Sequence, residues 1–294
     1  MQVAVSQFTT PLNSQQMPSD KVPLTANVAI FATYKSDETA IEDVCFYIEN
    51  NLSDITQLPE LFFIDDKSTL NDEALRERIA DLSELFIRQI SAVLRPYQYV
   101  CTSLVIEGQH QAVIISEQGI FAKQQQLHYC QRYQWTALSD VVNIIELPLE
   151  QGNITVAMLT ADDAKVPEIV SAAALHGVHT LLVPFDIQEA HEVESSLIDS
   201  AVENRICIVA ATREKSFVID EPIKNKQRGN KKKVKSQKST GLIINLTSSN
   251  PLLAQWQSKK QPGILNSALI KHQQGKITKA VIHPIAACEK LIVN

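Results

Sequence analysis

The stretch Ile154–Glu168, ITVAMLTADDAKVPE, constrains the fold of this chain more than any other. An apolar run is followed by an acidic turn, by Pro167-Glu168 and by a helix-like stretch that ends at His176. Because proline is tolerated in the first turn of a helix, this order predicts a buried strand, a tight bend and a helix. Such elbows expose the nucleophile in many α/β hydrolytic folds. The bend here, residues 160–163, contains neither Cys nor Ser.

Composition limits the classes of protein that the chain can belong to. Its 294 residues suffice for one large α/β domain or two small ones, and 45% hydrophobic with 20% charged residues is ordinary for a globular protein. Neither a dinucleotide fingerprint nor a P-loop is present. Five scattered cysteines favour free thiols over disulfides or zinc. We therefore expect no cofactor and no metal. Without a membrane-length apolar run or a signal-like start, we expect a cytoplasmic protein that does not bind membranes.

The hydrophobic pattern divides the chain into an extension and one domain. Residues 1–25 contain several prolines and polar residues, which is typical of a linker, and residues 26–294 form the domain. Helices are predicted over 37–51, with Asp37 as N-cap, and over 71–94, 169–176 and 188–204. Strands are predicted over 26–34, 55–63, 99–106, 112–116, 141–147, 154–160, 179–184, 206–212, 240–246 and 264–271, with an extended polar stretch over 120–129. Pairs of strands that alternate with helices indicate two sheets covered by helices.

One strongly basic segment interrupts this pattern. Lys224–Lys238 contains seven lysines, Arg228 and no acid, and removing these eight charges from the net of −6 leaves about −14 for the rest. A mobile, solvated loop is the simplest interpretation. The loop could also contact an anionic partner. Nucleic acid is possible but not favoured, because no aromatic residue is available for base stacking.

Four segments, in this order, resemble the nitrilase or carbon–nitrogen hydrolase superfamily. They are LPELFF (58–63), GIFAKQQQLHY (119–129), MLTADDAKVPEI (158–169) and HTLLVP (179–184) together with AVENRICIVAATR (201–213). The resemblance covers roughly residues 26 to 285. It implies a four-layer α-β-β-α sandwich, which agrees with the pattern of strands and helices.

The resemblance also implies a set of catalytic positions. In the family, a Cys thiolate attacks the amide or nitrile carbon, a Glu takes the proton and a Lys stabilises the oxyanion. Glu60 matches the general base, whereas Gln126 stands at the Lys position and Ala161 at the Cys position. Asp163 matches an Asp of the elbow. A further acidic position of the family corresponds to Gln131 or Arg132.

These departures leave three functions open. The first is a catalytically inactive nitrilase-like protein that acts through binding or assembly. The second is an active amidase or nitrilase with an atypical nucleophile, for which Thr160 is the candidate. The third is a nucleic-acid-associated protein. The absent Cys and Lys favour the first. The resemblance further implies a homodimer, for which Ile169–Leu175 and Ile285–Val293 offer apolar residues.

Overall fold

The computed structural model describes residues 25–33, 35–65, 70–186 and 197–212, together with the backbone of strands at 217–219, 237–239, 241–244, 252–254 and 266–271. Residues 1–24 of the predicted extension, 1–25, lie outside the described residues, and its last residue, Thr25, begins a strand. Among the described helices, none is long and apolar enough to cross a membrane.

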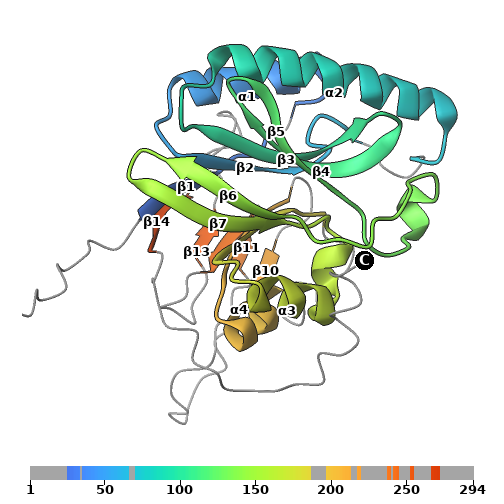
Figure 1. Ribbon diagram of the computed structural model, residues 1–294. Helices are drawn as coiled ribbons and strands as arrows, with labels where there is room; N and C mark the ends of the chain where they lie inside the picture. The colour runs from blue at the N-terminus through green and yellow to red at the C-terminus, as the bar shows by residue number, and fades with distance from the viewer. Residues whose placement is uncertain are drawn as a thin grey trace, which may run out of the picture.

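Two six-stranded sheets form the centre of the molecule (Figure 1). The first has the order β14-β1-β2-β3-β4-β5 and the second β13-β12-β9-β8-β7-β6. Their strands are β1 (Thr25–Ile30), β2 (Ile55–Glu60), β3 (Tyr99–Ile106), β4 (Gln109–Ser116), β5 (Gly119–Gln125), β6 (Ile144–Leu149), β7 (Gly152–Met158), β8 (Thr180–Pro184), β9 (Cys207–Ala211), β12 (Gly241–Ile244), β13 (Leu252–Ala254) and β14 (Asn266–Lys271).

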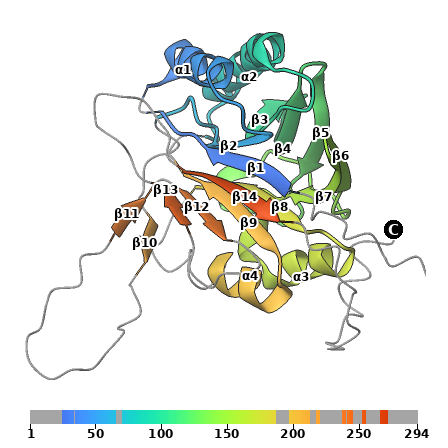
Figure 2. The ribbon, with the colours of Figure 1, turned by 90° about the vertical axis from the view of Figure 1, so that its left-hand side faces the viewer.

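Helices cover the outer face of each sheet (Figure 2). The helices α1 (Asp37–Glu49) and α2 (Glu73–Val93) lie on the first sheet, and α3 (Pro167–Leu175) and α4 (Asp199–Asn204) lie on the second. Three hydrophobic clusters match this arrangement: one under α1 and α2, one between the sheets and one under α3 and α4. The predicted α/β fold with two helix-covered sheets is therefore confirmed.

Local sequence explains where the helices begin and end. The Asp72 carboxylate caps α2 by accepting hydrogen bonds from the Ala74 and Leu75 amides at 2.8 and 3.2 Å. The helix α3 begins at Pro167, as predicted. Asp37 is not the N-cap that the sequence predicted. Ser36 occupies that position, and Asp37 instead forms an ion pair with Arg78.

The structure corrects one end of the predicted basic loop. Gln237 and Lys238 belong to the strand β11 (Gln237–Ser239), which pairs antiparallel with β10 (Phe217–Ile219). The β-favouring run Phe217–Ile219 supplies the partner that the sequence analysis did not foresee. Residues 220–236 lie outside the described residues, as do 188–196 of the predicted fourth helix.

Candidate functional site

Glu60 stands where β2 leaves its regular pairing with β3. The register between the two strands shifts between Gln57 and Glu60, and Leu61 then adopts a left-handed φ of 41°. An irregularity of this kind turns side chains away from their normal direction in the sheet. The Thr102 hydroxyl donates a hydrogen bond to the Pro59 carbonyl at 2.9 Å and fixes the bend. The Glu60 side chain is fully buried as a result.

Three side chains engage the Glu60 carboxylate. The Tyr133 hydroxyl donates to Oε1, which also lies 3.4 Å from His110 Nε2. Arg132 Nη2 lies 3.3 Å from Oε2. His110 also bonds to Ser103 Oγ at 3.0 Å and stacks on the Tyr133 ring. Burial and the adjacent Glu60 raise the pKa of Tyr133 well above its ordinary value of 10. Both oxygens of the candidate base are therefore occupied.

Arg132 is the centre of the site. Its guanidinium contacts Glu60 and two further carboxylates: Nη1 lies 2.6 Å from Asp186 Oδ2, and Nη2 lies 2.8 Å from Asp162 Oδ2. Glu60 ends a strand of the first sheet, whereas Asp162 and Asp186 follow β7 and β8 of the second. Burial alone would lower the pKa of Arg132, but these carboxylates raise it above its ordinary value. A permanent cation therefore joins the two sheets at this end.

The elbow contributes Asp162 to this network. The Asp162 carboxylate also accepts a hydrogen bond from the Cys130 thiol at 2.8 Å and contacts Lys165 Nζ at 3.3 Å. Burial would raise the pKa of Asp162, but Arg132, Cys130 and Lys165 lower it to about 2. The pKa of Cys130 is raised, first by burial and then by Asp162. Because the thiolate is the nucleophilic form, this environment disfavours attack by Cys130.

Asp163 holds the turn and the preceding segment together. Its buried carboxylate accepts hydrogen bonds from the amides of Leu127 and His128 at 2.9 and 3.1 Å and from Thr160 Oγ1 at 2.8 Å. It also lies 2.6 Å from His128 Nδ1, and this hydrogen bond raises the pKa of His128. The Thr160 hydroxyl is thus committed to the turn, and Thr160 is only 1% exposed.

The predicted site residues meet at one end of the sandwich. Arg132 connects Glu60 to the elbow, and Asp163 connects the elbow to the segment that carries Gln126. Gln126 is buried and donates from Nε2 to the His128 carbonyl at 2.6 Å. The Ala161 side chain is also buried, within the hydrophobic cluster under α3 and α4.

Sequence reasoning missed the partners of Glu60. Tyr133 and His110 belong to none of the motifs, and nothing in the sequence except its position after a strand marks Asp186. Arg132 was one of two matches to an acidic position of the family, and a positive charge at that position was the available clue. Cys130, one of the five scattered cysteines, has its thiol against Asp162 of the elbow.

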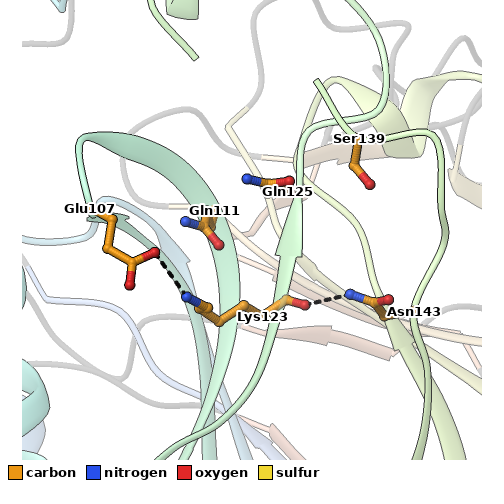
Figure 3. Close-up of a pocket in the computed structure, with 6 residues that line it drawn as sticks. All are labelled: Glu107, Gln111, Lys123, Gln125, Ser139 and Asn143. Atoms are coloured by element: carbon orange, nitrogen blue, oxygen red, sulfur yellow. Dashed lines mark hydrogen bonds and ion pairs between the residues drawn. The ribbon is translucent and has the colours of Figure 1, made fainter. Parts of the chain in front are cut away.

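A separate shallow pocket lies beside β4 and β5 (Figure 3). Its volume is about 290 Å³, and its lining is polar: Glu107, Gln111, Lys123, Gln125, Ser139 and Asn143. Lys123 Nζ lies 3.2 Å from Glu107 Oε2, and Asn143 Nδ2 donates to the Lys123 carbonyl at 2.7 Å. None of these residues belongs to the Arg132 network. Among the described residues, no group of three or more His, Cys, Asp or Glu side chains is arranged to hold a metal.

Comparison with solved structures identifies the fold. No protein-family model matches the sequence, and no curated protein matches it significantly. An amidase from Nesterenkonia sp. is 19% identical over 64% of this chain and 76% of its own, with a TM-score of 0.54. A cysteine-to-alanine mutant of the Nesterenkonia AN1 amidase from the nitrilase superfamily is 16% identical over 83% of this chain and 88% of its own, with a TM-score of 0.58. This chain has the fold of the nitrilase-superfamily amidases.

Proposed function

We propose that this protein is a catalytically inactive nitrilase-fold protein that acts through binding or assembly. The observation that carries the proposal is the position of Arg132, whose guanidinium lies between Glu60, Asp162 and Asp186. In the mechanism that the resemblance implies, the substrate carbon would need to reach both the general base and the elbow. Here a side chain of the protein itself bridges those two groups.

The missing groups support the same conclusion. Ala161 supplies no nucleophilic atom, and Gln126 brings no charge to an oxyanion. A solved relative, a mutant of the Nesterenkonia AN1 amidase, is described as carrying an adduct of acrylamide at its active-site cysteine. Cys130, whose thiol donates to Asp162 of the elbow, has a raised pKa.

Thr160 is the nucleophile that an active amidase would require, and its contacts argue against that role. Its hydroxyl donates to Asp163, which also receives the Leu127 and His128 amides. Rotating this hydroxyl toward a substrate would remove one hydrogen bond from a buried carboxylate. Such a loss costs about 1–3 kcal/mol.

Binding or assembly has two candidate surfaces. We propose a homodimer, but the predicted helical surface is smaller than the sequence suggested, because Ile169, Val170 and Ala173 are buried against the second sheet. Leu175 of α3 and Val202 of α4, at 51% and 55% exposure, remain available for pairing. We also propose that the basic segment 224–238 contacts an anionic partner, on the strength of its eight charges.

Ammonia release tests the proposal. Purified protein, incubated at high concentration with short aliphatic amides and nitriles, should release no more ammonia than a buffer blank. The variants Thr160→Ala and Cys130→Ala serve as matched controls, since each removes one candidate nucleophile. Release by the natural protein that disappears in either variant would show an active enzyme and refute the proposal.

A further inference from the structure

The end of the sandwich opposite to the Arg132 network carries exposed apolar side chains. Leu52 is 77% exposed, Tyr97 is 46% exposed and Phe121 is 41% exposed. They stand on the α1–β2 loop, on the turn before β3 and near the start of β5. Glu60 ends β2, whereas these residues lie near the beginnings of strands. The three residues, which we call the apolar pole, belong to no part of the candidate site.

Two hydrogen bonds and one ring contact hold the apolar pole together. Arg95 Nη2 donates to the Glu49 carbonyl, and Gln98 Nε2 donates to the Asn51 carbonyl, both at 2.9 Å. These bonds fix the turn that carries Tyr97 against the loop that carries Leu52. The Tyr99 and Phe121 rings meet edge to face with centroids 5.5 Å apart.

Tyr97 is presented in an unfavourable backbone conformation. Its φ is 63°, in the left-handed region where glycine is preferred. The turn is closed by a hydrogen bond from the Gln98 amide to the Arg95 carbonyl at 3.0 Å, with Pro96 at its second position. A large aromatic residue at the third position of such a turn costs conformational energy and exposes a ring to water. Strain of this kind is concentrated at functional surfaces.

Chain topology brings the C-terminal residues to this same end. Lys271, the last described residue, pairs with Thr25, and Asn27 lies beside Asp54 at the entrance to β2. The last described residue therefore lies at the same end of the sandwich as the apolar pole. The extended length of residues 272–294, about 75 Å, exceeds the roughly 24 Å that separate β14 from β5 at five strand spacings.

Charge and apolar content favour the C-terminal residues as the segment that covers the apolar pole. Residues 280–293 are mostly apolar, AVIHPIAACEKLIV, and need cover. Residues 277–294 contain two lysines and one acid. The turns around the apolar pole contain Asp54, Glu117 and Glu150 against one cation, Arg95. Residues 1–24, the other segment that enters here, have no such net charge.

We propose that the C-terminal residues 277–294 bind to the apolar pole of their own chain, with the run 280–293 covering Leu52, Tyr97 and Phe121. In this arrangement Ile285–Val293 would pack against their own chain and would not be available to a second copy. Homodimerisation would then use the exposed residues of α3 and α4. This arrangement does not depend on catalytic inactivity, because the Arg132 network lies at the other end of the sandwich.

Cross-linking to the native Cys288 tests the proposal. In full-length Leu52→Cys, a short bismaleimide should join Cys288 to position 52 within one chain, as mapped by peptide mass spectrometry. The matched control Leu175→Cys, also exposed, should give no link to Cys288. A link to position 175, a link formed only between chains, or no link to position 52 would each overturn the proposal.

Hydrogen exchange provides a second readout without a new cysteine. In the full-length double variant Ile285→Asp with Ile292→Asp, amides of residues 49–54 and 95–99 should exchange several-fold faster than in the natural protein. The control Gln273→Asp with Gln274→Asp adds the same charge outside the apolar run and should leave them unchanged. Equal exchange in both variants would contradict the proposed contact.

Discussion

Replacing Arg132 with alanine should strongly destabilise the protein. The substitution leaves Glu60, which is fully buried, and Asp162 and Asp186, whose side chains are each 14% exposed, without their shared cation. Lys165 and Cys130 still contact Asp162, and Tyr133 still donates to Glu60, so that these two carboxylates keep part of their stabilisation. Removing one partner of a buried ion pair costs about 3–5 kcal/mol. We expect a decrease of that size in the free energy of unfolding at pH 7.

The pH dependence of Arg132→Ala provides an internal check. Without the guanidinium, burial of Asp162 is offset less, so the pKa of this carboxyl should lie higher in the folded variant than in the folded natural protein. Stability of the variant should therefore improve relative to the natural protein as pH falls from 7 to 5. Urea unfolding at both pH values measures this difference.

Arg78→Ala is the matched control for this experiment. Arg78 lies 2.6 Å from Asp37, but its side chain is 59% exposed. An exposed pair contributes about 0–1 kcal/mol, so the control should change stability little. The reasoning would be refuted if Arg132→Ala cost less than about 1 kcal/mol, or if its cost were the same at pH 5 and pH 7.

Three further predictions concern other parts of the molecule. Asp162 has a folded-state pKa of about 2, below its ordinary value of 3.8, so its contribution of about 2 kcal/mol should be complete above about pH 5 and lost as pH falls through about 2; acid titration of unfolding should show this loss, and Asp162→Asn should lack it. Trypsin at low dose should cut first within 224–238 and leave associated fragments, and resistance there would contradict a mobile segment. Light scattering at micromolar concentration should give a dimer, whereas a mass near 32.7 kDa would count against pairing.

Sequence reasoning located the elements that position the site because their signals are local. Three signals are set by residues close in the sequence: the apolar run before residue 160, the proline at 167 and the helical spacing of apolar residues in α2. The structure contains the strand and the two helices that these signals predict. Short edge strands were harder: β10, β11 and β13 have three residues each and are defined by pairing with distant segments. Such pairing depends on tertiary context that no local pattern contains.

The candidate site shows the same limit at the level of side chains. Glu60, Gln126, Thr160 and Ala161 were identified through motifs, and the structure brings their segments to one end of the sandwich. Which residues surround Glu60 depends on the register shift near the end of β2 and on the short 3-10 helix η1 (Gln131–Tyr133). Arg132 of this helix contacts Glu60 and also carboxylates that follow strands of the second sheet. Arg132 and Asp186 are 54 positions apart in the sequence, and nothing between them predicts their contact.

A double-mutant cycle between Arg132 and Glu60 tests the central claim most directly. The free energy of unfolding would be measured for Arg132→Ala, Glu60→Gln and the double variant at pH 7. Because the two side chains share one buried network, the double variant should be less destabilised than the sum of the single variants, with a coupling energy of about 1–3 kcal/mol. Additive effects, within about 0.5 kcal/mol, would show that Arg132 does not engage the candidate base and would contradict the account.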